Sequence, residues 1–143
     1  VIVIDYKDDS RHDPMLNDDL IVALKLATPQ ELKKIKKAAL LVNALLVKFL
    51  ARQGIKLVDF KIEFGKQGKT IYLGDEISMD SMRLWDKKTG ESLDKDVYRF
   101  DKGDVMATYN RVAARITKKE TAAPAKKKAA APKKAAKKAG KRS

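Results

Sequence analysis

Three charged residues alternate with apolar residues in LVDFKIEFG, residues 57–65. Asp59, Lys61 and Glu63 occupy every second position, so a β-strand would carry them on one face and the apolar side chains on the other. Such a charged face is most often the solvated side of an antiparallel sheet. The alternative is a chemical site, because carboxylates held at a fixed spacing beside a base can bind a cation.

A second acidic segment follows a glycine-containing turn at residues 65–68. Residues 69–77, KTIYLGDEI, are predicted to form the return strand of a hairpin. An even register would place Asp75 on the same face as Asp59 and Glu63, although the sequence does not fix the register. Crowded carboxylates repel one another unless a cation compensates, and magnesium takes one or two carboxylates together with water and phosphates. Glu63 and Asp75 are therefore the predicted metal ligands.

Two helices are predicted to support the hairpin. The first spans residues 28–53, with Thr28 as N-cap and Glu31 at the capping-box position. The second spans about 104–116, where apolar residues recur at helical spacing. These elements predict an α+β domain in which an antiparallel sheet containing the 57–77 hairpin packs against both helices.

Length and charge divide the 143-residue chain into two parts. Residues 1–117 are nearly balanced in charge and can bury one modest core, so we expect one folded domain there. No cysteine is present, which excludes disulfides and thiolate metal sites and agrees with a cytoplasmic location. The longest apolar stretch, residues 38–47, is too short to cross a bilayer, so no membrane association is expected.

Residues 118–143 form a tail built almost entirely from Lys, Ala and Pro. The tail holds eleven of the 32 Lys and Arg residues and one acid, Glu120, and so accounts for +10 of the net charge of +13. It lacks large apolar residues, which predicts disorder. Its composition resembles the basic tails of linker histones, which favours weak, salt-dependent binding to nucleic acid. The alternative is a solubilising appendage without a dedicated partner.

Four motifs together point to a family. HDPMLND, LVDFKIEFG, GDEISMDSMRLWD and LDKDVYR occur in this order, and the combination closely resembles the C-terminal half of SAICAR synthetase (phosphoribosylaminoimidazole-succinocarboxamide synthase). The resemblance covers residues 1 to about 117. Met79 departs from the family pattern, which usually has proline there. The resemblance implies that the domain is the larger lobe of an ATP-grasp-like fold.

The resemblance also implies a reaction and a site. The family is a carbon–nitrogen ligase of purine biosynthesis that uses ATP and Mg²⁺ to join L-aspartate to a carboxylated aminoimidazole ribotide (CAIR), through an acyl phosphate. By resemblance, Glu63 and Asp75 are the magnesium and nucleotide-site acids, and Lys61 and Asp59 are catalytic residues beside them. Arg83 would hold the ribotide phosphate. The remaining residues that would line the CAIR or aspartate pocket are Asp80, Lys95, Arg99 and Asp13.

The family's N-terminal half, with its loop over the ATP phosphates, has no counterpart in this sequence. We therefore expect a fragment, or one part of a split enzyme, that is inactive without a complementary N-terminal half; self-association is a further expectation. Two other functions stay open. A nucleic-acid-associating protein would lose binding when residues 118–143 are deleted. A non-catalytic remnant would gain no activity from an added N-terminal half.

Overall fold

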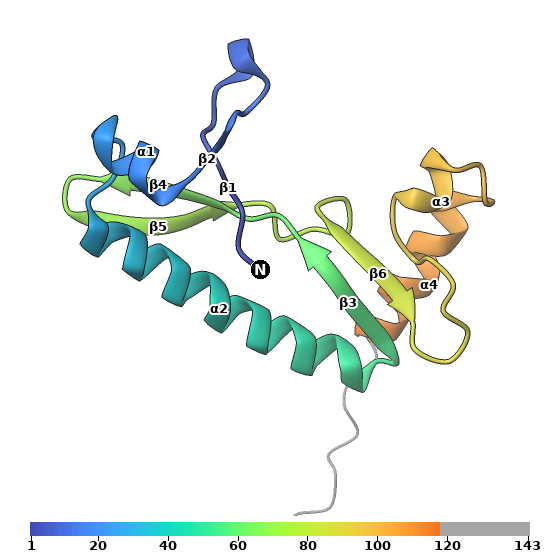
Figure 1. Ribbon diagram of the computed structural model, residues 1–143. Coiled ribbons are helices and arrows are strands. Elements are labelled where there is room, and N and C mark those ends of the chain that lie inside the picture. Colours follow the sequence, from blue (N-terminus) through green and yellow to red (C-terminus); the bar gives the residue numbers. More distant parts are fainter. Residues whose placement is uncertain (118–143) are drawn as a thin grey trace, which may run out of the picture.

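The computed structural model describes residues 1–117. These residues form an α+β arrangement of antiparallel strand pairs and packed helices, as predicted (Figure 1). The predictions of disorder and nucleic-acid binding for residues 118–143 lie outside the described residues.

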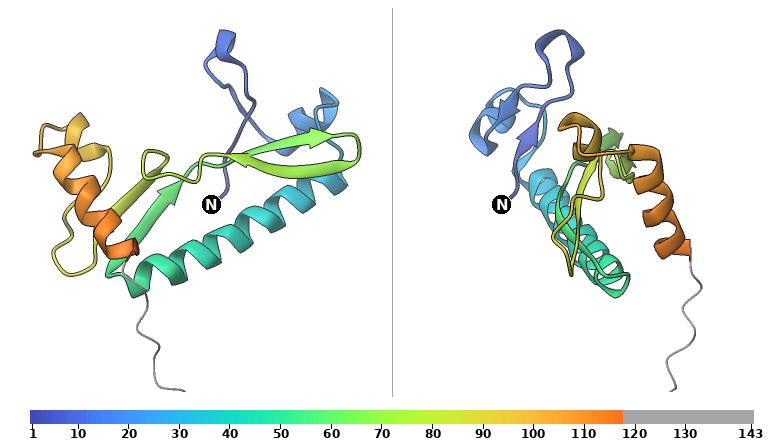
Figure 2. Two further views of the ribbon diagram at one scale, coloured as in Figure 1. Left: turned by 180° about the vertical axis from the view of Figure 1, so that it is seen from behind. Right: turned by 90° about the vertical axis from the view of Figure 1, so that its right-hand side faces the viewer.

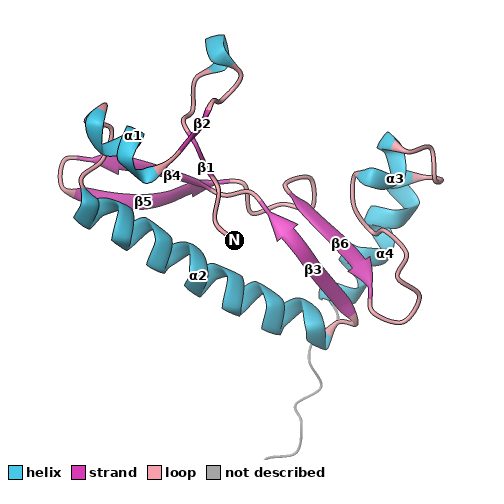
Figure 3. Ribbon diagram, viewed as in Figure 1, coloured by secondary structure: helices cyan, strands magenta, loops and turns pink. Residues whose placement is uncertain are grey.

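Within residues 1–117 the strands are short and occur in three antiparallel pairs, β1–β2, β3–β6 and β4–β5 (Figure 3). They are β1 (Ile4–Asp5), β2 (Met15–Leu16), β3 (Ile55–Phe60), β4 (Glu63–Gln67), β5 (Thr70–Asp75) and β6 (Met82–Asp86). The helices are the short 3₁₀ helix η1 (Asp9–Arg11), α1 (Asp18–Ala23), α2 (Pro29–Arg52), α3 (Asp96–Arg99) and α4 (Val105–Thr117).

The strand predicted over residues 57–65 is divided in two. β3 ends at Phe60 and pairs with β6, whereas β4 begins at Glu63 and pairs with β5. The expectation of one sheet containing the whole 57–77 hairpin was therefore wrong. A register shift between Leu57 and Asp59 disrupts the β3–β6 ladder, and such bulges bend a strand. At the break, the Lys61 amide donates to the Ser81 carbonyl at 2.9 Å instead of continuing a ladder.

Helix α2 begins as its sequence predicts. The Glu31 amide donates to Thr28 Oγ1 at 3.2 Å, and the Thr28 amide donates to Glu31 Oε2 at 2.8 Å, which completes the capping box. The helix ends before Gly54, whose φ of +72° is the left-handed conformation that glycine adopts without strain. The predicted helix near 104–116 is also present, as α4.

The hydrophobic core lies around the β3–β6 pair, which is placed between α2 and α4 (Figure 2). Its members are contributed by both helices, both strands and the segment after β6. They are Leu50, Ile55, Met82, Leu84, Leu93 and Val112. This core fixes β6 and the turns at its ends, and those turns carry several of the predicted site residues.

Helix α2 has a second apolar face that the rest of residues 1–117 leaves uncovered. Leu32 and Leu50 are buried against the fold, but large apolar side chains elsewhere on the helix are exposed. They are Leu40, Leu41, Leu45, Val47 and Phe49. A helix that is apolar around most of its circumference is usually covered on more than one side. Among residues 1–117, no helix is both long and apolar enough to cross a membrane.

The start of α2 should give the fold a measurable dependence on acid. Hydrogen bonds from the Thr28 amide, Lys66 and the Thr28 hydroxyl lower the pKa of Glu31 from 4.5 to about 2. A carboxyl whose pKa is lower in the folded state stabilises the fold above its unfolded pKa, and that contribution is lost as pH falls from 4.5 toward 2. We expect Glu31→Gln to be less stable at pH 7 and to lose less stability on acidification.

Urea unfolding midpoints measured from pH 7 to pH 2 for the wild type and Glu31→Gln test this. Asp19→Asn, which changes an exposed acid in the first turn of α1, is the control. Parallel pH profiles for the wild type and Glu31→Gln would contradict the expectation.

Candidate active site

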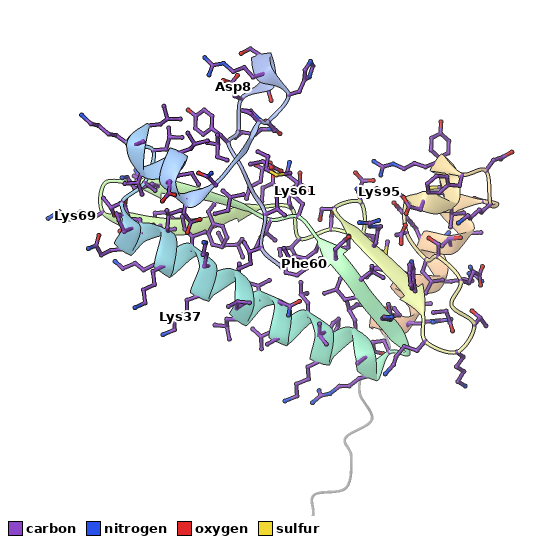
Figure 4. All side chains as sticks on the ribbon, viewed as in Figure 1. Asp8, Lys37, Phe60, Lys61, Lys69 and Lys95 are labelled. Carbon is purple, nitrogen blue, oxygen red and sulfur yellow. The ribbon has the colours of Figure 1, made fainter. Side chains whose placement is uncertain are left out.

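Lys61 lies at the break between β3 and β4, surrounded by acidic side chains. Its Nζ is 3.2 Å from Glu63 Oε1, 3.8 Å from Asp13 Oδ2 and 4.0 Å from Glu76 Oε1. The hydrogen bond with Glu63 is the main reason that the pKa of Lys61 is raised. Phe60 and Lys61 lie on opposite sides of the chain at this point (Figure 4). Phe60 and Lys61 thus alternate in direction as predicted, and Lys61 faces carboxylates, although β3 ends at Phe60.

Lys7, which precedes η1, is the second cation of this group. Its Nζ is 3.3 Å from Asp9 Oδ1, 3.5 Å from Asp13 Oδ2 and 3.9 Å from Glu63 Oε1. The pKa of Lys7 is raised, first by its hydrogen bond with Asp9 and then by the charge of Asp13. We call Lys7, Asp13, Lys61, Glu63 and Glu76 the charged cluster. With two cations and three carboxylates, its formal charge is −1, so it favours a further cation.

A closed loop after β1 delivers Asp13 to the charged cluster. The Asp8 amide donates to Asp13 Oδ1 at 2.9 Å, and the Asp13 amide donates to the Asp8 carbonyl at 3.1 Å. The first of these bonds is the largest cause of the lowered pKa of Asp13. His12 and Asp13 both have positive φ, at 56° and 49°, a conformation that costs free energy for residues other than glycine. The loop thus holds Asp13 ionised and beside both lysines.

Glu63 and Asp75 are opposite one another in the β4–β5 ladder. The Glu63 side chain is 29% exposed and faces Lys61, while Asp75 is exposed and accepts a 2.7 Å hydrogen bond from the Glu76 amide. Glu76 itself has a positive φ of 79°. The predicted hairpin is therefore present, and the backbones of Glu63 and Asp75 are partners in it across a register shift.

Asp59 does not join that pair, contrary to the even-register expectation. It belongs to the β3–β6 pair, where it lies opposite Arg83. Arg83 Nε donates to Asp59 Oδ1 at 3.0 Å, and its Nη2 contacts Asp59 Oδ2, so the guanidinium is engaged by both oxygens. The physical reason is the break at residues 61–62, which separates the two strand pairs. Asp59 therefore orients Arg83 rather than adding charge near Glu63.

The other predicted pocket residues gather near the start of β6 and α3. Lys95 Nζ donates to the carbonyl of Asp80, and Arg99 Nη1 lies 3.7 Å from Asp96 Oδ1. The charges of Asp80 and Asp94 raise the pKa of Tyr109, after the larger effect of burial. We call Arg83, Lys95 and Arg99 the basic group. Asp80 is thus near Lys95 through its backbone.

The loop between β5 and β6 connects the basic group with the charged cluster. Ser81 Oγ donates to the carbonyls of Glu76 and Ser78, and the Ser81 carbonyl accepts from the Lys61 amide. Ser81 is only 8% exposed, so these bonds are sheltered from water. One short loop therefore links Glu76 of the cluster, the Lys61 backbone and the chain leading to Arg83.

A family model for SAICAR synthetase matches residues 1–116. The chain belongs to the SAICAR synthetase family. The phosphoribosylaminoimidazole-succinocarboxamide synthase of Methanoregula boonei is 83% identical over 126 residues, which cover 88% of this chain and 49% of that protein. The enzyme of the same name from Methanocaldococcus jannaschii is 56% identical over 117 residues, which cover 81% of this chain and 48% of that protein. The chain thus spans about half the length of these relatives and matches their C-terminal half.

Solved SAICAR synthetases have the same fold over this half. The Pyrococcus horikoshii crystal structure superposes with a TM-score of 0.76 at 51% identity, covering 82% of this chain and 51% of that one. A SAICAR synthetase structure described as a complex with ADP superposes with a TM-score of 0.77 at 50% identity. The match covers 82% of this chain and 50% of that one. The family and the fold suggested by the sequence motifs are confirmed.

The residues of this SAICAR synthetase chain could supply only part of the coordination shell of a magnesium ion. Within residues 1–117, no group of three or more His, Cys, Asp or Glu side chains is arranged to hold a metal ion by itself. Magnesium, however, commonly takes one or two carboxylates and completes its shell with water and phosphate oxygens. Glu63, a member of the charged cluster, and Asp75, its backbone partner on the hairpin, supply two carboxylates of the kind that this mode uses. The donor set therefore suits a magnesium ion that arrives with a nucleotide.

Sequence reasoning missed two members of the charged cluster, Lys7 and Glu76. Glu76 adjoins Asp75 in the GDE motif, so that motif was the available signal. Lys7 lies more than fifty residues from Lys61 in the sequence, and only the path of the N-terminal loop brings it near.

Two hollows in the surface of residues 1–117 lie away from the charged cluster. One, of about 460 Å³, lies between β1–β2 and the starts of α1 and α2, and another, of about 370 Å³, lies between α2 and β5. No residue of the charged cluster lines either hollow.

Proposed function

We propose that this chain is the C-terminal half of an ATP-dependent ligase that joins L-aspartate to CAIR, giving SAICAR, ADP and phosphate. The observation that carries the proposal is the charged cluster, in which Lys61 lies between Glu63, Asp13 and Glu76. Glu63 is also the ladder partner of Asp75. Membership of the family and the ADP complex of a relative support it. The proposed location is the cytoplasm.

The proposed chemistry has two steps. A carboxylate oxygen of CAIR attacks the γ-phosphorus of ATP, which forms an acyl phosphate and releases ADP. The amine of aspartate then attacks the acyl carbon, inorganic phosphate leaves, and the amine loses a proton. Phosphoryl transfer of this kind depends on cations that offset charge on the transferring oxygens. When bound, Mg²⁺ would supply that neutralisation, with Glu63 and Asp75 as its ligands.

The chain's own side chains divide the remaining tasks. Lys61 is placed to steady phosphate or carboxylate oxygens, because its ammonium already sits among oxygens at 3.2–4.0 Å. Arg83 presents a planar fork suited to the ribotide phosphate, and Asp59 keeps that fork oriented. Asp80, Lys95, Arg99 and Asp13 would line the CAIR and aspartate pocket. In this proposal Asp59 acts on the substrate through Arg83.

An assay of SAICAR formation tests the proposal. The chain is incubated with ATP, Mg²⁺, aspartate and CAIR, alone and with a second polypeptide that supplies the half of the family that it does not match. We expect no product from the chain alone and product from the mixture, since the relatives are about twice the length that it covers. Product from the chain alone would overturn the expectation of inactivity. No product from a mixture that demonstrably forms a complex would overturn the ligase proposal.

A further inference from the structure

Asp94 is a fully buried carboxylate that the proposed chemistry does not use. Its exposed fraction is 0%, and it follows Leu93, which is equally buried. Asp94 Oδ2 accepts the Leu84 amide at 2.6 Å and Oδ1 accepts the Asp96 amide at 2.8 Å. A buried carboxylate is costly unless both oxygens are hydrogen-bonded. Each oxygen here has its own backbone donor.

The two bonds of Asp94 join the segments that carry the basic group. Leu84 follows Arg83 on β6, and Asp96 follows Lys95 at the start of α3. The Leu93 amide also donates to the Leu84 carbonyl at 2.7 Å. Leu84 is thus bonded to the segment after β6 at both its backbone groups: its carbonyl accepts the Leu93 amide, and its amide donates to the Asp94 side chain. This carboxylate therefore ties the start of α3 to β6.

We propose that Asp94 is a positioning residue that sets the spacing of the basic group: Arg83 on β6, Lys95 just before α3 and Arg99 at the end of α3. The proposal rests on the proposed function, in which these cations bind a phosphorylated ribotide. Asp94 cannot touch that substrate, because it is enclosed by protein. It acts through the two amides that it holds, one beside Arg83 and one beside Lys95.

A change in the spacing of the basic group should weaken substrate binding. Recognition of phosphate or carboxylate by a guanidinium depends on the direction of its N–H groups as well as on charge. Small displacements of positioned groups can cost about 100-fold in rate or affinity. A change at Asp94 should therefore weaken binding of the anionic substrate more than it slows the chemical steps at Lys61, which lies in the other group.

The structure offers a control carboxylate on β6, the strand that Asp94 contacts. Asp86, at the other end of β6, accepts the Lys88 amide at 2.8 Å and the Thr89 amide at 3.0 Å, and pairs with Arg115 at 2.8 Å. It thus has the same number of backbone donors as Asp94. None of the basic group adjoins it in the sequence, so Asp86→Asn should disturb the fold without changing the spacing of the basic group.

The experiment compares Asp94→Asn with Asp86→Asn in the enzyme assembled with the complementary half. Asparagine has one oxygen acceptor, so Asp94→Asn loses one of the two amide bonds. We expect the KM for CAIR to rise about tenfold with kcat changed less than about threefold in Asp94→Asn, and both constants to stay within about twofold in Asp86→Asn. Hydrogen exchange of the isolated chain should show lost protection at Leu84 or Asp96 in Asp94→Asn only.

Equal kinetic constants in the two variants would overturn the proposal even if Asp94→Asn is less stable. Asp94→Ser, which keeps one hydroxyl acceptor, replaces Asp94→Asn if the latter does not fold, and failure of both to fold would also overturn it. If the assembled wild type makes no SAICAR, the ligase proposal fails. The positioning role of Asp94 is then tested by measuring CAIR binding to the isolated chain through the fluorescence of Trp85. Weaker binding by Asp94→Asn than by Asp86→Asn supports it, and equal binding or none overturns it.

Discussion

Lys61→Met is expected to lower the kcat/KM of the assembled ligase by about 100- to 1,000-fold, the usual cost of removing one group that stabilises transition-state charge. Methionine keeps the length and most of the apolar stem of lysine but removes the ammonium. Asp13, Glu63 and Glu76 would then lose the cation that they share. Steady-state kinetics with CAIR, aspartate and ATP varied in turn would measure the effect.

The same substitution should change stability by less than about 1 kcal/mol, because the Lys61 side chain is 48% exposed and exposed ion pairs contribute little. Lys66→Met is the control, since Lys66 is also 48% exposed and pairs with Glu31 at 3.0 Å, away from the charged cluster. If both variants lose activity to the same degree, Lys61 has no special part in the reaction.

Ile55→Ala is expected to destabilise the folded chain by about 2–5 kcal/mol, the usual cost of such a truncation in a core. Ile55 is 0% exposed at the start of β3 and packs in the cluster that joins α2 to the β3–β6 pair. The core has few members, so little neighbouring volume is available to fill the cavity. Urea unfolding followed by the fluorescence of Trp85, the one tryptophan of the chain, measures the change.

Val58→Ala is the matched control for Ile55→Ala. It removes part of another β-branched side chain from the same strand, but Val58 is 37% exposed. A surface substitution of this kind changes stability by about 0.5 kcal/mol or less. Similar losses for the two variants would show that the core is not where the structure places it.

The features that sequence predicted well are those fixed by neighbouring residues. The capping box at Thr28 and Glu31 involves residues three apart, and the β4–β5 hairpin closes over a short glycine-containing turn. Both could be predicted because the interacting groups are close in the chain. The pairing of Glu63 with Asp75, by contrast, did not follow from that turn, because a register shift between Glu63 and Phe64 alters the ladder there.

The features that sequence did not predict depend on contacts between distant residues. Nothing in the letters of LVDFKIEFG marks the break after Phe60, which arises from pairing of β3 with β6 and from the bond between the Lys61 amide and Ser81. The same break decides that Asp59 meets Arg83. Most of the candidate site residues came from the likeness to a family, and the structure then showed which of them lie together.

The uncovered apolar face of α2 has a practical meaning for every measurement on the isolated chain. Leu41, Leu45 and Phe49 are exposed to solvent. Two copies of the chain that associate through these side chains would do so only in the folded state. By mass action, such pairing would raise the apparent unfolding free energy with protein concentration. Denaturation midpoints from dilution series, extrapolated to low concentration, therefore give the stability of the monomer.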